Sequence, residues 1–350
     1  MLPVVQENTY LSDAFTEKPR DVKALTAEWE PLAPVGPSVA FHAACIIRGA
    51  MYVHGGVEQK DGKQPSNALH KLDLSTGMWS RIQTSGSPAL SHHCALAIDD
   101  RYMLLVGGWN GRLRVPDVFA YDAQENQWLP IATAGFLEGA GLSSHTASLF
   151  SSGEILVIGR EGSLRTQRRH GSAFLLSGNV QSGKFKYSEY SHEVSSRSGH
   201  SATFLGSKLY IIGGRSDNLL EVCEIVAGGF SPHPSGKCSI MGTLAEASKS
   251  GRLKVLTKMP CGRKSHTTIS GSGVLLVYGG ETFDGRSREP VGEMILIAFT
   301  PGPQFYTLGV SRLGRAGHVV CVTDNEIIMH GGLGSRSHVY GDAYKLVLHS

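Results

Sequence analysis

Short apolar runs recur along this chain, and each run ends at a glycine. The runs are rich in branched and aromatic side chains and comprise Met51–Val53, Leu104–Val106, Ile155–Ile158, Leu209–Ile212, Leu275–Tyr278 and Ile327–Met329. A short apolar run closed by a turn residue is typical of a buried β-strand. The pattern therefore predicts an all-β chain built from six similar units, which we number one to six.

The glycines that follow these runs are almost evenly spaced. Five units carry a glycine pair: Gly55/Gly56, Gly107/Gly108, Gly213/Gly214, Gly279/Gly280 and Gly331/Gly332. In unit three Gly159 is followed by Arg160, for which we expect an ordinary negative φ, because arginine tolerates a positive φ poorly. The first glycines lie 52, 52, 54, 66 and 52 residues apart. A constant period of this length indicates a repeat architecture.

Each unit also carries a histidine at a fixed place, 13 or 14 residues before its first glycine. These repeat histidines are His42, His93, His145, His200, His266 and His318. A small-apolar segment such as Ala43–Ile47 separates the histidine from the apolar run, and alternating segments such as Leu69–Leu74 and Met78–Ile82 follow the glycines. Four strands in each unit is the pattern of a propeller blade.

The two ends of the chain supply complementary parts of one unit. The last unit ends with a third strand at Ala343–Leu348. Glu28–Leu32, in contrast, precedes the first histidine as a predicted fourth strand that belongs to no unit before it. We expect the N-terminal strand to complete the last blade, which removes an exposed sheet edge. Trp29 then takes in that blade the place of Trp79 and Trp128.

These residues resemble the kelch-repeat propeller family over residues 27–350. The resemblance is carried by the six phased glycine and histidine positions and by the segments Val106–Gly111, Gly141–Thr146 and Ser196–His200. It implies a six-bladed kelch β-propeller with a binding role, and it implies no enzymatic activity. Residues 1–26 form a polar lead-in. The long fourth step reflects an insertion at residues 227–251, expected to be an exposed loop because it has few aliphatic residues.

Composition limits the function classes. Glycine accounts for 43 of 350 residues, and the net charge of +3 is too small to argue for nucleic-acid binding. No apolar stretch approaches the length of a signal peptide or a membrane span. The six cysteines show no C-x-x-C spacing, and we interpret them as structural residues. We expect a monomeric cytoplasmic protein, with a nuclear or ciliary location left open.

No catalytic or metal-binding pattern emerges from the sequence. In a six-fold ring the repeat histidines would be spread around a channel, too far apart to share zinc, whose ligand nitrogens lie about 2.0–2.1 Å from the metal. No Ser/His/Asp order, phosphate-binding loop or pair of carboxylates stands out. We therefore predict no metal, no cofactor and no enzymatic activity.

Arginine marks one face of the predicted propeller. We call this the mouth face: it carries the loops from second to third strand and from the fourth strand to the next unit. Arg197, Arg263 and Arg315 each stand three residues before a repeat histidine, which predicts that they lie at the channel mouth. Further arginines on these loops are Arg112, Arg165, Arg168, Arg169, Arg215 and Arg336. Because arginine can grip a carboxylate at two points, we expect an acidic segment of a partner protein to bind here.

Kelch propellers also occur in three other functional classes. Several kelch proteins are substrate-recognition adaptors of ubiquitin ligases, but those carry a second domain that we do not find here. A fixed scaffold component of a cytoskeletal or ciliary assembly fits the sequence equally well. Some kelch propellers are copper-dependent oxidases, yet the predicted mouth is dominated by arginine, serine and glycine rather than by copper ligands.

Overall fold

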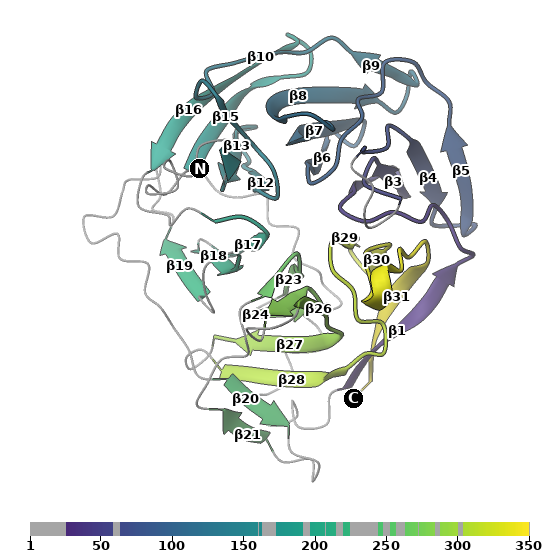
Figure 1. Cartoon of the computed structure of the whole chain (residues 1–350), viewed down its shortest axis with the longest axis vertical. Coiled ribbons are helices and arrows are strands. Elements are labelled where there is room, and N and C mark those ends of the chain that lie inside the picture. Colours follow the sequence, from purple (N-terminus) through teal and green to yellow (C-terminus); the bar gives the residue numbers. More distant parts are fainter. Residues whose placement is uncertain are drawn as a thin grey trace.

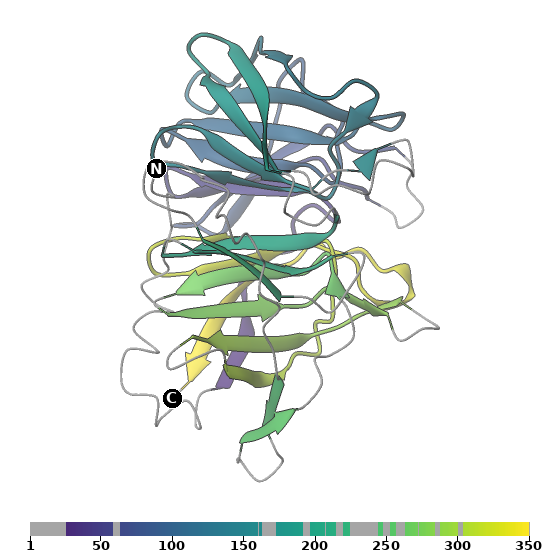
Figure 2. The ribbon, with the colours of Figure 1, turned by 90° about the vertical axis from the view of Figure 1, so that its left-hand side faces the viewer.

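The computed structural model describes residues 26–58, 64–159, 161–162, 173–191, 197–206, 208–214, 220–224, 244–247, 253–256, 263–271, 273–283, 288–299 and 304–349. These residues form an all-β structure. No α-helix occurs among them, and one 3₁₀ turn lies at Ser335–Ser337. Figure 1 shows the sheets arranged around a central axis, and Figure 2 shows the same sheets from the side.

The first two units form four-stranded antiparallel sheets in chain order. Their strands are β2 Ala43–Ile47, β3 Ala50–His54, β4 Leu69–Asp73 and β5 Met78–Ile82 in unit one, and β6 Cys94–Ile98, β7 Tyr102–Trp109, β8 Arg114–Asp122 and β9 Gln127–Leu129 in unit two. The predicted strands are present. β7 is longer than expected, because it continues through the glycine pair with a register shift between Val106 and Gly108.

The next two units depart from that plan. Unit three contains β12 Thr146–Leu149, β13 Ile155–Ile158, β15 Ala173–Asn179 and β16 Lys184–Ser191, with β10 Ala132–Ala134 added in parallel at the outer edge. Unit four contains β17 His200–Leu205, β18 Lys208–Gly213 and β19 Leu220–Glu224. The hairpin β20 Leu244–Ala247 and β21 Leu253–Leu256 lies alongside β28 of unit five. The expectation of an insertion without strands is therefore wrong for β20.

The last two units are again four-stranded. Unit five contains β23 Thr267–Gly271, β24 Val274–Tyr278, β27 Glu293–Ala298 and β28 Gln304–Val310. Unit six contains β29 Val319–Val322, β30 Ile327–His330, β31 Ala343–His349 and β1 Thr26–Ala33. β1 pairs antiparallel with β31, from Thr26 opposite His349 to Ala33 opposite Ala343, so residues from both ends of the chain share one sheet.

Short sheets link the loops of the mouth face. They consist of β11 Ala140–Gly141 with β14 Glu161–Gly162, and of β22 Arg263–Lys264 with β25 Glu281–Phe283 and β26 Arg288–Pro290. Isolated bridges join equivalent positions in other units, such as Ala40 with Val57 and Ser91 with Trp109. In each case the segment before a repeat histidine pairs with the segment after the glycines, which orders the mouth face.

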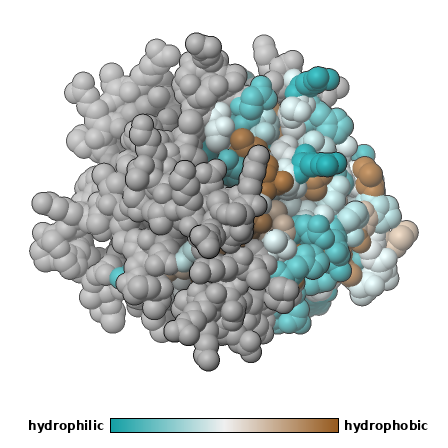
Figure 3. Space-filling model, turned by 90° about the horizontal axis from the view of Figure 1, so that it is seen from below, coloured by the Kyte–Doolittle hydropathy of each residue, from teal (hydrophilic) through white to brown (hydrophobic). Residues whose placement is uncertain are grey.

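Hydrophobic clusters fill the spaces between successive sheets. Cys45 and Met103 belong to the cluster between units one and two, and four further clusters follow between successive units up to unit six. Another cluster joins Ile328 of unit six to Met51 of unit one. Because a strand buried on both faces needs a continuous apolar run, this packing explains the runs in the sequence. Larger exposed apolar side chains are scattered (Val35, Met78, Leu113, Leu137 and Val310), and brown residues are interspersed with hydrophilic ones in Figure 3.

Trp29 packs as an equivalent of the other outer-strand tryptophans. Its ring lies 5.0 Å from that of Tyr278, the residue before the glycine pair of the preceding unit. The rings of Trp79 and His330 lie 4.9 Å apart, and those of Trp128 and His54 lie 5.4 Å apart, and both histidines occupy that same place before a glycine pair. Trp29 thus occupies in unit six the place of Trp79 in unit one and Trp128 in unit two.

Replacing Trp29 by alanine should lower the free energy of unfolding by about 3–5 kcal/mol, because the substitution leaves a large cavity against Tyr278. Urea denaturation monitored by circular dichroism measures the change. Met78→Ala is the control: Met78 lies on an outer strand but is 64 % exposed, so its loss should cost less than about 0.5 kcal/mol. Deleting residues 1–34 should destabilise the chain further, whereas deleting 1–24 retains β1. If the 1–34 deletion melts within a degree of the full chain, β1 does not stabilise unit six.

Candidate functional site

The glycine pair and the repeat histidine meet at every seam between units. A Cβ added to Gly55 would lie 3.0 Å from Cε1 of His93, and one added to Gly331 would lie 2.7 Å from Cε1 of His42. The equivalent contacts at Gly107, Gly159, Gly213 and Gly279 measure 2.7–2.9 Å. Only glycine leaves space for the imidazole of the next unit, and the positive φ of these positions also favours it.

The second glycine forms the seam hydrogen bond. Its N–H donates to the carbonyl of the residue three places before the next repeat histidine, as in Gly56 to Leu90 at 2.8 Å and Gly332 to Val39 at 2.8 Å. Gly108, Gly214 and Gly280 make the same bond over 2.9–3.0 Å. The Gly332 bond joins unit six to unit one, so the same seam recurs between the last and first units. Arg160, at the sixth of these positions, lies outside the described residues.

The residues before the repeat histidines form a closed ring of hydrogen bonds. Each N–H donates to the carbonyl of the equivalent residue in the preceding unit, over 2.7–2.9 Å. The members, all with φ between 52° and 71°, are Phe41, His92, Ser144, Gly199, Ser265 and Gly317. Phe41 donates to Gly317, which returns the chain of bonds to its start. We call this set the backbone ring; its amides and carbonyls satisfy one another.

The repeat histidines are buried and neutral. Burial is the main cause that lowers the pKa of all six, to about 4 for His145 and about 3 for His200 and His318. Nε2 of His266 lies 3.0 Å from Ser201 Oγ, and Nε2 of His93 lies 3.0 Å from His54 Nδ1. His54 and His330, which pair with His93 and His42, have pKa values lowered to about 3 by the same burial. These imidazoles hold neighbouring units together.

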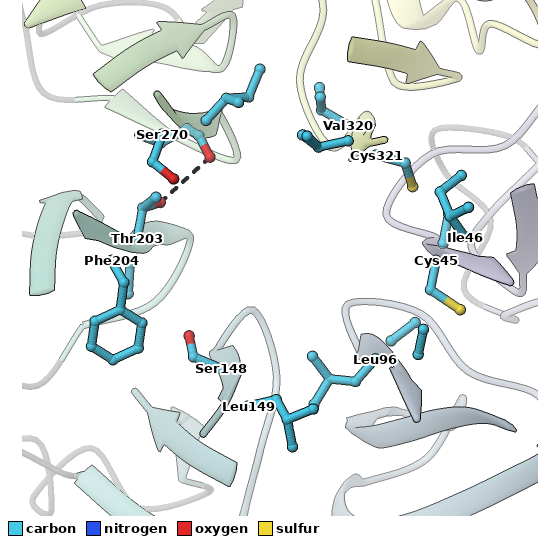
Figure 4. Close-up of a pocket in the computed structure, with 17 residues that line it drawn as sticks. Cys45, Ile46, Leu96, Ser148, Leu149, Thr203, Phe204, Ser270, Val320 and Cys321 are labelled. Atoms are coloured by element: carbon cyan, nitrogen blue, oxygen red, sulfur yellow. Dashed lines mark hydrogen bonds between the residues drawn. The ribbon is translucent and has the colours of Figure 1, made fainter. Parts of the chain in front are cut away.

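A channel runs along the axis between the first strands of the units. Its cavity of about 330 Å³ is lined by apolar side chains such as Ile46, Leu96 and Val320 and by hydroxyls such as Ser270 (Figure 4). No described residue of this wall is charged, and burial raises the pKa of the Cys321 thiol to about 12. The described wall therefore consists of apolar, hydroxyl and thiol groups.

The structure buries the three arginines that were expected at the channel mouth. Exposed fractions are 6 % for Arg197, 5 % for Arg263 and 0 % for Arg315. Each Nη1 donates at 2.9 Å to the carbonyl of the first glycine of its own unit, which explains why the side chains turn inward. Units one to three have the aliphatic residues Val39, Leu90 and Leu142 at the equivalent position.

Two of these guanidinium groups also bind a carboxylate. Arg263 Nη2 lies 2.5 Å from Glu293 Oε2, and Arg315 Nη1 lies 2.8 Å from Asp342 Oδ1. Burial lowers the pKa of Arg263, and Glu293 opposes that shift. The Arg315 guanidinium also lies 4.1 Å from the ring centroid of Tyr340. These contacts fix the loops before β27 and β31.

Other predicted site residues are spread over the mouth face. Arg112 and Arg336 are exposed. Arg165, Arg168, Arg169 and Arg215 lie outside the described residues. The prediction missed the aromatic residues Phe41, His92 and Trp109. The loop order of the sequence does put Arg114 and Lys264 on the mouth face, although neither was assigned to the binding site. A signal was present in the sequence, since Phe41 and His92 directly precede repeat histidines.

These three aromatic residues and two cations line a depression above the backbone ring. We call this depression the cup; it has a volume of about 350 Å³ and is lined by Phe41, His92, Trp109, Arg114, Ser143, Ser144, Ser198, Gly199, Lys264 and Ser265. Its described lining includes two cations and no carboxylate. Lys264 Nζ lies 3.0 Å from Glu281 Oε2, and the Arg114 guanidinium lies 5.8 Å from the Trp109 ring.

Metal-ligating groups occur elsewhere. Among the described residues, the one cluster of three such groups within reach of each other is Glu28, Glu30 and His349, which lies at the β1–β31 edge and includes no repeat histidine. Glu30 also lies 3.9 Å from Lys345 Nζ, which competes with a cation for its carboxylate. The described part of the chain contains no apolar helix of membrane-spanning length.

Comparison with known proteins agrees with this geometry. The family model described as "Attractin/LZTR1 beta-propeller" matches residues 17–223. "Kelch domain-containing protein 9" of Homo sapiens is 32 % identical over 324 residues, covering 87 % of this chain and 91 % of the relative. The chain belongs to the kelch-type β-propeller family.

Two further proteins resemble this kelch propeller, one in sequence and one in structure. "Kelch-like protein 15" of Danio rerio is 30 % identical over 259 residues, which cover 71 % of this chain and 39 % of that longer protein. The solved structure titled "Structure of YjhT" superposes with a TM-score of 0.66 at 16 % identity, covering 91 % of this chain and 100 % of that one. The structural match supports the propeller fold alone.

Acidification should destabilise this kelch propeller below pH 6.5. The unfolded histidines take up protons near pH 6.5, whereas burial holds the pKa of all eight buried imidazoles well below that value, at about 4 for His145 and about 3 for His200 and His318. Each such histidine therefore lowers the free energy of unfolding by about 1.4 kcal/mol per pH unit within that window. Urea midpoints at pH 8.0, 7.0, 6.0 and 5.0 should be constant above pH 7 and then fall steeply. A flat profile between pH 7 and 5 contradicts this account.

Arg315→Met should lower the free energy of unfolding by about 1–3 kcal/mol, because the Gly331 carbonyl and the Asp342 carboxylate lose their donor. Arg312→Met provides a matched control in the same segment, since Arg312 is exposed and its replacement should change stability by less than about 0.5 kcal/mol. Thermal melting compares the two variants. Equal melting temperatures would show that the buried guanidinium does not stabilise the mouth face.

Proposed function

We propose that this chain is a non-enzymatic protein-interaction module that binds an acidic segment of a partner protein on its mouth face. The proposal includes a single six-bladed propeller over residues 27–350, in which β1 completes the last blade. It also includes a monomer that acts in the cytoplasm without metal or cofactor and contacts neither nucleic acid nor membrane.

Support for the six-bladed ring comes from three independent sets of contacts. The backbone ring has six members and returns to its start at Phe41 and Gly317. The glycine–histidine contact at Gly331 and His42 repeats between units six and one. The antiparallel pairing of β1 with β31 provides the fourth strand of the last sheet.

The cup is the observation that carries the proposed binding role. It lies directly over the channel end, and the described residues that line it combine aromatic rings, hydroxyls and the cations Arg114 and Lys264. A concave site with a few converging polar groups is the usual form of a recognition site. Kelch-type relatives that share this propeller support a protein as the ligand rather than a small-molecule substrate.

The arginines then divide into two roles. Arg197, Arg263 and Arg315 are buried, so we assign them to positioning the mouth loops rather than to direct contact. Arg112 and Arg336 are exposed on second-to-third-strand loops and can reach a partner. On sequence position alone, Arg165, Arg168, Arg169 and Arg215 belong to loops of the same face.

Reversing the two exposed charges tests the proposed face. The double variant Arg112→Glu, Arg336→Glu should weaken binding of the main partner about tenfold, because rim charges favour association with an acidic segment. Quantitative affinity purification with crosslinking, repeated at rising salt, measures the loss. Lys184→Glu with Lys186→Glu is the control, since both lysines are exposed on the outer strand β16.

A deletion within the insertion tests whether the partner binds away from the mouth face. If the arginine double variant retains its partner while deletion of residues 228–250 abolishes capture, the partner binds near the insertion. Crosslinks should otherwise map to residues around the cup, including Lys264.

A further inference from the structure

The backbone ring forms the floor of the cup, and its hydrogen bonds limit which groups the cup can bind. All six amides of the backbone ring already donate to ring carbonyls over 2.7–2.9 Å. An anion seated on the floor would need unused N–H donors, which this ring does not supply. The cations of the cup lie in its lining and are engaged, because Lys264 pairs with Glu281 and Arg114 lies over Trp109.

One side of the cup is aromatic. A Cβ added to Gly317 would lie 2.5 Å from the Phe41 ring, so this ring covers the backbone of unit six. The His92 ring stacks on Phe41 with a centroid distance of 4.2 Å and an interplanar angle of 13°. Trp109 lines the same side. Successive members of the backbone ring thus build a short aromatic stack.

The side chains of the backbone ring change from planar rings to a hydroxyl where the ring continues from His92 to Ser144. After Phe41 and His92, the next member has a hydroxyl in place of a ring, and Ser143, Ser198 and Ser265 continue the hydroxyl side. These small side chains leave the volume of about 350 Å³ beside the aromatic stack. This is enough for one large planar side chain, and aromatic groups favour offset-stacked or edge-to-face contacts with rings of this kind.

From these observations we infer that the cup binds a single aromatic side chain of the acidic partner segment, which joins the Phe41–His92 stack, while flanking carboxylates meet the cations of the mouth face. This inference rests on the proposed function and names the anchor residue that gives it specificity. A central aromatic anchor surrounded by polar contacts is the common arrangement at protein interfaces.

Synthetic peptides test the anchor with the full chain. Three capped, fluorescein-labelled peptides carry tryptophan, leucine or alanine between two identical glutamate-rich flanks, and fluorescence anisotropy gives their dissociation constants. The tryptophan peptide should bind roughly tenfold or more tighter than the alanine peptide, with leucine between them, because stacking adds to the buried area.

Two substitutions assign the effect to the cup. His92→Asn should abolish the preference for tryptophan, and asparagine is chosen because it tolerates the φ of 56° at this position. His338→Asn is the matched control, since His338 is exposed on the mouth face outside the cup lining. This variant should keep the preference. Melting curves confirm that both variants are folded.

The outcomes separate the two proposals. Equal, salt-sensitive binding of the tryptophan and alanine peptides overturns the aromatic anchor but leaves the acid-binding mouth face intact. Retention of the tryptophan preference in folded His92→Asn also overturns the anchor. Absence of binding by every peptide in low salt overturns both the anchor and the acidic-segment function.

Discussion

The seam between neighbouring units depends on one contact, in which an imidazole covers the first glycine of the preceding unit. This contact excludes any side chain at the glycine and places the following N–H against a carbonyl of the next unit. Since the imidazole is buried, it must remain neutral, and its Nε2 pairs with a hydroxyl or with another imidazole at most seams. The apolar clusters between sheets and the backbone ring both require the spacing that this contact sets.

The units use this common seam differently on the two halves of the molecule. In units one to three, an aliphatic side chain fills the position three residues before the repeat histidine, as at Leu90. In units four to six the same position holds an arginine whose guanidinium binds a carbonyl in its own unit, as Arg197 binds Gly213. A buried guanidinium needs its hydrogen bonds satisfied, so these arginines order loops. The loops of the mouth face are therefore ordered by buried aliphatic side chains in units one to three and by buried guanidinium groups in units four to six.

The aromatic and charged groups on which our proposed function depends lie on loops rather than on the sheets. The described channel wall is uncharged, whereas the cup combines planar rings, serines and cations from five units. Side chains on these loops can change without disturbing the seams, because each seam uses backbone atoms, a glycine and a buried imidazole. This separation of the framework from the proposed binding surface supports our proposal that partner specificity resides at the mouth.

The sequence by itself determined the repeat, most strands of the repeating units and the place of β1, but not the added strands β10 and β20. Six phased glycines and histidines define the units. Both signals are local, because each unit contains a strand that ends at a glycine and a histidine at a fixed distance before that glycine. Tertiary structure alone decided where the side chains point. The spacing of Arg263 and Arg315 placed them near the mouth, but their burial depends on Glu293 and Asp342, which lie 30 and 27 residues further along. The cup likewise required the folded chain, since Phe41, Trp109 and Lys264 come from three units and meet only when the ring of hydrogen bonds brings their backbones together.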